Sequence, residues 1–261
     1  MNTYSLLIAP TTTLFALRHR ADPVKRTRLA QQVAAAVIAA AAAMSASAAP
    51  DDHTVPDTMA QRVQACTACH GKEGVSTREG YIPRIAGKPA GYLFNQLLNF
   101  RDGRRNNAAM AVLIDNMSEL YLHEVAGHFA ALNLPYPPPP LRSVTARELE
   151  RGEILVRQGD LSLRLPACAQ CHGAALTGVA PSIPGLVGLP KDYLLAQLGA
   201  WRTGLRRARP PDCMGEISRR LSHQDLSAVA TYLALRPVPR DAAPAAFLPA
   251  PLPIPCGGDV R

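Results

Sequence analysis

The sequence has few aromatic residues and no long apolar run, and both deficits limit what the protein can be. Phe, Trp and Tyr together make up 5% of the 261 residues. Side chains alone would therefore fill the centre of each folded unit only thinly. The apolar run from Val33 to Met44 has about 12 residues, whereas a membrane-spanning helix needs roughly 20. No stretch clearly reads as a strand, so the sequence predicts an all-α fold.

The first 49 residues have the order of features that is typical of a secretory signal peptide. Five basic residues lie between positions 18 and 28, an alanine-rich run follows, and the small residues 46–48 offer a cleavage site. We therefore expect residues 1–49 to be removed and the protein to lie in a bacterial periplasm; an uncleaved anchor is the alternative. Removal lowers the formal net charge from +8 to +4. No motif supports nucleic-acid binding, so we expect no nucleic-acid partner.

One pentapeptide pattern occurs twice and indicates the chemistry. Cys66-Thr-Ala-Cys69-His70 returns 102 residues later as Cys168-Ala-Gln-Cys171-His172. Cys-x-x-Cys-His is the attachment signature of a c-type haem: each thiol adds to one vinyl group of the porphyrin, and the imidazole becomes the proximal iron ligand. The sequence therefore predicts two covalently attached haem c groups, whose propionates add about four negative charges and bring the mature protein near neutrality.

Two other readings use the same cysteine pairs. A structural zinc site does not require a histidine directly after the second cysteine of both pairs. A thioredoxin-like redox motif follows a strand, and neither pair is preceded by a strand of Val and Ile. Both readings therefore explain the sequence less well than haem attachment does.

The repetition extends well beyond the cysteine motifs. The pattern Ile-Pro-x-x-x-Gly at 82–87 returns at 183–188, and a Tyr-Leu, Gln-Leu, Gly and Arg pattern at 92–105 returns at 193–206, both at an offset of 101. A constant offset indicates a duplicated domain. We expect a first haem domain at 50–134, a Pro-rich linker at 135–142, a second haem domain at 143–237 and a Pro- and Ala-rich tail at 238–261.

Apolar periodicity places the main helices of each domain. The tail's composition, in contrast, is compatible with disorder or with a docking strand. The expected helices are opening helices around 57–65 and 143–158, middle helices at 92–100 and 193–201, and last helices that follow Ser118 and Ser222.

Each iron needs a second axial ligand before the protein is a closed electron carrier. Met110 lies 40 residues after His70, and Met214 lies 42 residues after His172. Because both methionines stand at equivalent points of the two repeats, we expect them to be the axial ligands. A thioether ligand favours ferrous iron and raises the potential.

Other side chains are weaker candidates for this position. Met117 is the reserve ligand of the first domain, but its counterpart in the second is Leu221, which cannot bind iron. His123, His128 and His223 would lower the potential as ligands. They do not occupy matching positions, so we interpret them as surface or helix-flanking residues.

Two prolines recur between the haem motif and the middle helix of each repeat. The carbonyl groups of Pro83 and Pro184 can accept a hydrogen bond from Nδ1 of the proximal imidazole, which fixes the ring and raises its basicity. A loop-shaping role is the alternative.

Two cysteines remain outside the haem motifs. Cys213 precedes Met214, and Cys256 lies in the tail. In an oxidising compartment they can form a disulfide that holds the tail near the second haem. If Cys213 is free instead, its thiolate can replace Met214 on the iron.

With these residues placed, the sequence resembles the dihaem class I cytochromes c, and most closely the cytochrome c4 family, over residues 55–236. The haem motifs, the Ala-Gly and Tyr-Leu-x-x-Gln-Leu pattern in 83–100 and the lead-in at 159–168 carry the resemblance. It implies two all-helical class I domains related by pseudo-twofold symmetry, with the haems facing each other at the interface. It also implies His70 with Met110 and His172 with Met214 as axial pairs.

The same resemblance implies a function. We expect a periplasmic carrier of single electrons whose partners are periplasmic or membrane-bound redox proteins, such as a dehydrogenase, an oxidase or a quinol-oxidising complex. Peripheral association with a membrane is compatible with this role. Six-coordinate iron has no open position, so we expect no catalysis. The alternatives are a haem subunit held in a periplasmic dehydrogenase complex and, less favoured, a dihaem oxidase or peroxidase.

Overall fold

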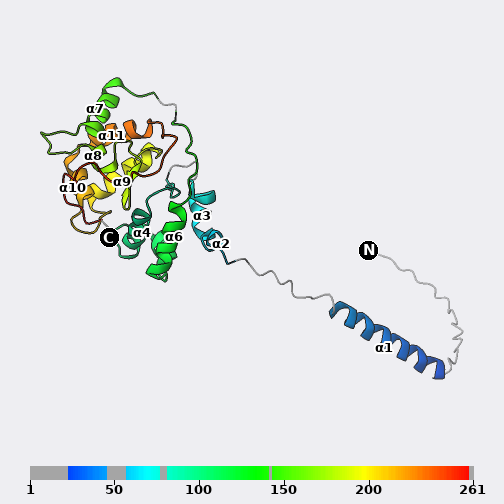
Figure 1. The fold of residues 1–261 in the computed structure, drawn as a ribbon. Coiled ribbons are helices and arrows are strands. Elements are labelled where there is room, and N and C mark those ends of the chain that lie inside the picture. Colours follow the sequence, from blue (N-terminus) through cyan, green and yellow to red (C-terminus); the bar gives the residue numbers. More distant parts are fainter. Residues whose placement is uncertain (1–22, 46–56, 77–80, 141–142, 259–261) are drawn as a thin grey trace, which may run out of the picture. The chain divides into compact units, whose positions relative to one another are not determined.

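The computed structural model describes residues 23–45, 57–76, 81–140 and 143–258 (Figure 1). The chain divides into two units, residues 1–55 and 56–261. In the first unit, helix α1 spans Pro23–Ser45 and lies within the predicted signal peptide, whose cleavage site at 46–48 is outside the described residues. Among the described residues, no helix has the length and apolar character needed to cross a membrane.

The second unit begins with a helical lobe that contains the first Cys-x-x-Cys-His motif. Side chains of Thr58, Asn107 and Ser118 accept hydrogen bonds from backbone N–H groups three residues ahead, at 3.3, 3.0 and 3.2 Å. These caps satisfy donors that the first turn of a helix leaves unpaired. The helices of this first lobe (57–134) are α2 (Met59–Arg62), α3 (Gln64–His70), the 3-10 helix η1 (Lys72–Gly74), α4 (Ala90–Arg101), α5 (Ala108–Ile114) and α6 (Glu119–Ala130).

A second lobe (143–237) repeats this arrangement. Thr145 caps its first helix, and Ser222 and Asp225 form the capping pair that the sequence indicates, with Asp225 N donating to Ser222 Oγ at 3.0 Å. Its elements are α7 (Ala146–Arg157), α8 (Cys168–His172), β1 (Gly178–Val179), β2 (Ile183–Pro184), α9 (Lys191–Thr203), α10 (Cys213–Arg220) and α11 (His223–Ala234).

The structure confirms the predicted middle and last helices and the opening helix of the second repeat, and it differs at three places. The helix expected at 57–65 is divided into α2 and α3. Helices α5, α8 and α10 were not predicted, because each has fewer than nine residues and shows too little periodicity. A short antiparallel ladder of β1 and β2 also forms, against the expectation of no strands, where the loop after the second haem motif folds back on itself.

Each lobe has its own apolar core. In the first, α6 packs on α4 and buries Leu122 and Phe129, while Leu98 of α4 is 2% exposed. In the second, α11 packs on both α7 and α9 and buries Tyr232 and Leu233. The cores therefore hold α4 and α9 in equivalent positions.

The lobes contact each other through equivalent backbone segments. Arg105 and Arg206 form an isolated antiparallel bridge, and Arg207 N donates to the carbonyl oxygen of Arg104 at 2.7 Å. On α4, a Cβ at Gly91 would lie 2.8 Å from the carbonyl oxygen of Pro181, so this approach requires glycine. The duplicated arginines thus lie at the centre of the interface between the lobes.

The Pro-rich segment after the first lobe is bound to that lobe. Arg84 donates hydrogen bonds to the carbonyl oxygens of Leu134 and Pro135 at 2.6 and 3.1 Å. Its guanidinium also lies 3.9 Å from the centre of the Tyr136 ring. Residues 141–142 of the predicted linker are outside the described residues.

Replacement of Gly152 by Ala should destabilise the second lobe. A Cβ at this position of α7 would lie 2.2 Å from the carbonyl oxygen of Ala228 in α11, so the two helices must move apart. We expect Gly152→Ala to lower the free energy of unfolding by about 1–3 kcal/mol. Chemical denaturation of the haem-loaded protein, followed by far-UV circular dichroism, measures this change.

Gly199→Ala is the matched control, because Gly199 also lies inside a helix but a Cβ there meets nothing within 4 Å. We expect no destabilisation, since Ala has the higher helix propensity. Equal effects of the two substitutions would show that close packing of α7 on α11 does not contribute.

Candidate haem sites

The two Cys-x-x-Cys-His motifs lie on short helices that end at the histidine. Helix α3 ends at His70 and α8 at His172, and the next residues, Gly71 and Gly173, have φ values of +77° and +82°. Glycine adopts this conformation without steric cost, so the chain turns away directly after each histidine. Within each helix the two cysteines are three residues apart and therefore share a face.

Each histidine ring is held by the proline carbonyl that the sequence indicates. The distance from His70 Nδ1 to the carbonyl oxygen of Pro83 is 2.8 Å, and from His172 Nδ1 to that of Pro184 it is 2.7 Å. Burial lowers the pKa of both histidines, although the proline carbonyl partly opposes this. A neutral ring that donates from Nδ1 keeps the lone pair of Nε2 available for a metal ion.

Both motifs open into one continuous cavity of about 1090 Å³. This volume exceeds the roughly 300–1,000 Å³ of ordinary small-molecule sites. His123, His128 and His223 do not line the cavity, so its geometry favours methionine over histidine as a further ligand. The predicted site residues that do line it are Cys66, Cys69, His70, Pro83, Met110, Cys168, Cys171, His172, Pro184 and Met214, together with the reserve candidate Met117.

Met110 and Met214 lie in the first turn of short capped helices. Asn107 Oδ1 accepts from Met110 N at 3.0 Å at the start of α5, and Asp212 Oδ1 accepts from Gly215 N at 3.0 Å at the start of α10. These caps fix the two methionine segments in equivalent ways. The methionines therefore reach the cavity from elements other than those that carry the histidines.

The six cysteines fall into two groups. Cys213 and Cys256 form a disulfide, whereas both cysteines of each haem motif are free. Burial raises the pKa of the Cys66 and Cys171 thiols and raises that of Cys168 to about 12. The disulfide that the sequence left open is thus present, and the motif thiols are not paired with one another.

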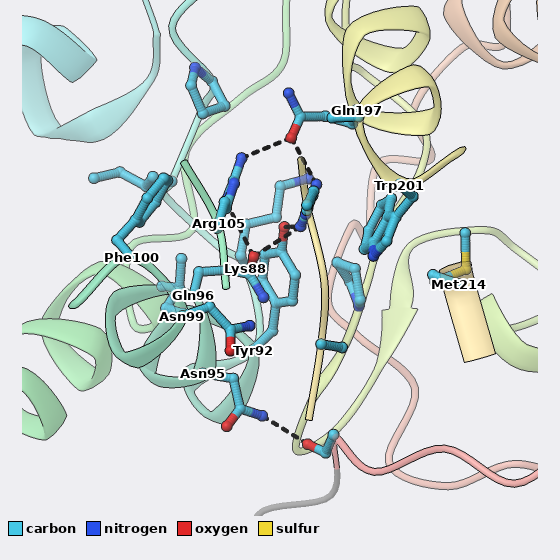
Figure 2. Close-up of a pocket in the computed structure, with 18 of the residues that line it drawn as sticks. Lys88, Tyr92, Asn95, Gln96, Asn99, Phe100, Arg105, Gln197, Trp201 and Met214 are labelled. Atoms are coloured by element: carbon cyan, nitrogen blue, oxygen red, sulfur yellow. Dashed lines mark hydrogen bonds between the residues drawn. The ribbon is translucent and has the colours of Figure 1, made fainter. Parts of the chain in front are cut away.

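A symmetric polar cluster lies at the interface between the lobes, beside the cavity (Figure 2). Arg105 donates to Gln96 and Gln197 at 3.1 and 2.9 Å, and Arg206 donates to the same glutamines at 2.7 Å each. The tyrosines of the repeats complete the pattern. Arg105 Nη2 lies 3.1 Å from Tyr193 Oη, and Arg206 Nη2 lies 3.4 Å from Tyr92 Oη.

This cluster carries positive charge without a carboxylate. Arg206 is 3% exposed, and Lys88, which lines the same cavity outside the cluster, is 5% exposed; no ion pair among the described residues includes either of them or Arg105. Burial, and then the Arg105 charge, lowers the pKa of Arg206, and burial lowers that of Lys88 to about 8. Buried cations without a counter-ion are costly, so this site favours an anionic group.

One buried donor in the cavity wall also has no acceptor. Trp201 Nε1 makes no hydrogen bond, and its ring lies 3.7 Å from the guanidinium carbon of Arg206. A propionate-bearing porphyrin would supply both the negative charge and the acceptor that these side chains require. The residues present therefore fit a haem at each motif.

The sequence shows that several of these residues are repeated, but it does not show that they meet in one cluster. Tyr92, Gln96 and Arg105 were matched with Tyr193, Gln197 and Arg206 as evidence of duplication. The available signal was that two polar residues, Gln and Arg, are retained at equivalent positions of both repeats. Lys88 and Trp201 gave no such signal, because neither has an identical counterpart.

Comparisons with known proteins agree with this geometry. Residues 164–235 match the family model for cytochrome c. The thiosulfate dehydrogenase electron acceptor of Thiomonas intermedia is 36% identical over 67% of this chain and 79% of its own length. Cytochrome c4 of Pseudomonas aeruginosa is 31% identical over 69% of this chain and 89% of its own length.

Solved structures show the same likeness. The thiosulfate dehydrogenase TsdBA from Marichromatium purpuratum matches with a TM-score of 0.61 and 32% identity, covering 69% of this chain. Our chain corresponds to only 39% of that longer chain. Reduced cytochrome c4 from Pseudomonas stutzeri matches with a TM-score of 0.57 and 27% identity, and 95% of its length is covered.

Replacement of Trp201 by Phe should change the potential of one haem only. We expect Trp201, on α9 of the second lobe, to donate to a propionate of the second haem. The variant keeps a ring beside Arg206 but removes this N–H group, and a propionate with one donor fewer stabilises ferric iron. We expect the potential of the second haem to fall by about 30 mV, roughly half the change that a tenfold shift in a one-electron equilibrium gives. An optical redox titration measures it.

The first haem is the internal control, because the counterpart of Trp201 is Phe100. A fall in both potentials, or in neither, would contradict the assignment of Trp201 to the second haem.

Proposed function

Because the chain belongs to the cytochrome c4 family of dihaem c-type cytochromes, we propose that it accepts single electrons from a periplasmic dehydrogenase and passes them to a second redox protein. The protein is an electron-transfer cytochrome of the all-α class I fold with covalently bound haem c, and it is not an enzyme. One observation carries the proposal: both haem motifs line a single cavity.

We assign one haem to each lobe. Cys66 and Cys69 bind the first porphyrin, and Cys168 and Cys171 bind the second. The iron ligands are His70 with Met110 and His172 with Met214. Bound haem supplies reversible one-electron chemistry at an iron atom that has no open position. The domain limits at 50–134 and 143–237, with the linker at 135–142, follow from this assignment.

The side chains and carbonyl groups around the cavity favour electron transfer by fixing the iron ligands and by placing positive charge near the haems. Pro83 and Pro184 hold the imidazole rings, so the iron ligands need not reorient when the charge changes. Arg105 and Arg206 place positive charge at the interface, where they would neutralise propionates of the bound haems. Because the two sites share one cavity, an electron that enters at one haem has a short path to the other.

Two relatives direct the choice of donor. The proteins from Thiomonas intermedia and Stutzerimonas stutzeri, 36% and 37% identical, are both named thiosulfate dehydrogenase electron acceptor. TsdBA, with a TM-score of 0.61, is named thiosulfate dehydrogenase. We therefore take a thiosulfate-oxidising dehydrogenase as the candidate donor. A freely diffusing carrier and a subunit of a dehydrogenase complex are both compatible with this role.

A periplasmic location is part of the proposal. The basic segment and alanine-rich run within residues 1–49 support export. Disulfide formation between Cys213 and Cys256 is also favoured in an oxidising compartment.

Rapid reduction by a thiosulfate dehydrogenase is the direct test of function. When the oxidised holoprotein is mixed with a purified thiosulfate dehydrogenase and thiosulfate, we expect both haems to be reduced, because oxidation of thiosulfate releases electrons that the ferric haem irons accept. Stopped-flow absorbance at the haem α-band follows the reaction.

The control omits thiosulfate and then adds dithionite, which shows that both haems are competent. A protein that dithionite reduces fully, but that the dehydrogenase with thiosulfate leaves oxidised, would exclude this donor.

Substitution of the axial methionines tests the ligand assignment. Met110→Ala and Met214→Ala should each leave one iron five-coordinate, so the ferrous variant binds one carbon monoxide per protein. We expect the far-red sulfur-to-iron band of the ferric protein to fall by about half in each variant.

Met117→Leu is the matched control, because leucine occupies the equivalent position 221. An intact far-red band in Met110→Ala, together with a weakened band in Met117→Leu, would transfer the ligand role to Met117.

A further inference from the structure

The C-terminal segment 243–258 follows the second lobe and is fastened on both sides of its haem site. We propose that this segment, which we call the strap, is a positioning element that restrains Met214 and closes the methionine side of the second haem cavity. The proposal rests on the proposed role of Met214 as an iron ligand. The strap follows the second repeat and is not itself duplicated, so the sequence predicts no equivalent segment for the first lobe.

The first attachment of the strap lies on the histidine side. Ala245 forms a parallel bridge with Val179 of β1. Its N–H donates to the carbonyl oxygen of Gly178 at 2.9 Å, and its carbonyl oxygen accepts from Ala180 N at 2.8 Å. Strand β1 pairs with β2, which contains Pro184, the residue whose carbonyl oxygen holds His172.

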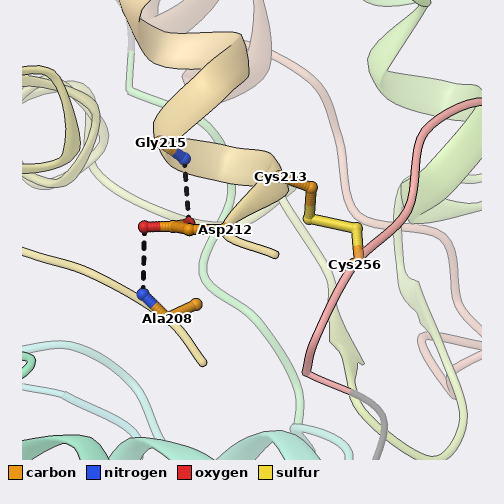
Figure 3. The surroundings of a disulfide bond; sticks show 5 residues. All are labelled: Ala208, Asp212, Cys213, Gly215 and Cys256. Atoms are coloured by element: carbon orange, nitrogen blue, oxygen red, sulfur yellow. Dashed lines mark hydrogen bonds between the residues drawn. A yellow bond between two sulfur atoms is a disulfide. The ribbon is translucent and has the colours of Figure 1, made fainter. Parts of the chain in front are cut away.

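The second attachment lies on the methionine side and is covalent. Cys256 forms a disulfide with Cys213, the residue directly before Met214 (Figure 3). The next residue, Gly257, donates from its N–H to the carbonyl oxygen of Pro211 at 2.8 Å. A Cβ at Gly257 would lie 2.1 Å from the carbonyl oxygen of Pro210, so the strap lies directly against the loop that leads into α10.

The third attachment reaches the first lobe. Asn95 of α4 is 8% exposed and donates from Nδ2 to the carbonyl oxygen of Gly258 at 2.6 Å. The counterpart of Asn95 in the second repeat is Ala196, which has no donor. The end of the strap thus links the methionine loop of one lobe to the interface helix of the other.

Alternation of exposure shows which side of the strap faces the cavity. Pro251, Pro253 and Pro255 are exposed, whereas the residues between them are partly buried. The cavity-lining residues of the strap are Leu252, Ile254, Cys256 and Gly258. Apolar side chains on one face of an extended chain are typical of a segment that covers an apolar site.

Among the described residues, no segment is crosslinked to the methionine side of the first lobe. Ala109 stands where Cys213 stands in the second lobe, and it is exposed. Nearby Val112 is 78% exposed. The two methionine segments therefore have matching caps but different restraints, which makes the first haem an internal control for the second.

A restraint on Cys213 acts on Met214 through the backbone. For methionine to leave the iron, its segment must move away from the haem. A crosslink that closes a long loop reduces the number of conformations open to that segment. We expect local opening at Met214 to be rarer than at Met110, because free energies of local opening follow the contacts that hold a segment.

Displacement of methionine by added imidazole tests the proposal. In the oxidised full-length holoprotein, the loss of the far-red band after mixing with imidazole should show a faster phase from the first haem and a slower phase from the second. In Cys213→Ser/Cys256→Ser, we expect the slower phase to accelerate at least about tenfold. The faster phase should stay unchanged.

Three further variants assign and control the phases. A Met110→Ala background removes the first-haem phase, so the remaining phase belongs to Met214. Asn95→Ala should accelerate the second-haem phase by a smaller factor, because the disulfide remains. Phe247→Ser, at a residue that is 79% exposed, should change neither phase.

The outcomes separate the strap from the proposed function. If the slower phase has the same rate in the parent protein and in the double serine variant, or if both phases accelerate equally, the strap proposal is overturned. The assignment of the methionine ligands is unaffected by either result. A far-red band in the parent protein that Met214→Ala does not diminish would overturn the ligand assignment, and the strap proposal with it. Acceleration confined to the second haem supports both.

Discussion

The interface between the lobes depends on two guanidinium groups, one buried (Arg206) and one half-buried (Arg105), which share the same glutamine acceptors and form no ion pair among the described residues. Arg105 and Arg206 form the bridge between the lobes, and both donate to Gln96 and Gln197. Like charges in a low-dielectric site repel each other. Propionates of bound haem would offset that repulsion, so docking of the lobes and loading of the cofactors would stabilise one another. One electrostatic requirement therefore connects the lobe interface with haem binding.

The two halves have diverged away from this centre. The residues of the interface cluster are matched pairs, whereas the residues around the methionine segments differ: Ala109 stands where Cys213 stands, and Asn95 where Ala196 stands. Symmetry is thus retained in the cluster of arginines, glutamines and tyrosines between the lobes. It is lost at the contacts that hold the two methionine segments, so the two proposed haem sites are not equivalent.

The sequence predicted what short-range spacing encodes. The Cys-x-x-Cys-His motifs and the middle helices α4 and α9 are defined by residues a few positions apart. The methionine ligands, which stay a prediction, rest instead on equivalent positions in the two repeats. The path of the strap was not predictable, because Asn95 and Gly258 are 163 residues apart and share no pattern. The interface cluster lies between these cases: its repetition was visible, but the pairing of Arg105 with Arg206 depends on tertiary packing.

The helices that carry the proposed haem ligands are short. Helices α3, α5, α8 and α10 have 7, 7, 5 and 8 residues, fewer than the roughly 12–15 that an isolated helix needs to persist in water. Their order must come from contacts outside the helical ladder: the described ones include the caps and one disulfide, and haem attachment would add thioether links to α3 and α8. Electron transfer is faster when the iron ligands do not have to move, and in this fold contacts outside each short helix hold the ligands in place. Because α5 and α10 differ in that external support, the rigidity of each methionine is set independently of the shared interface.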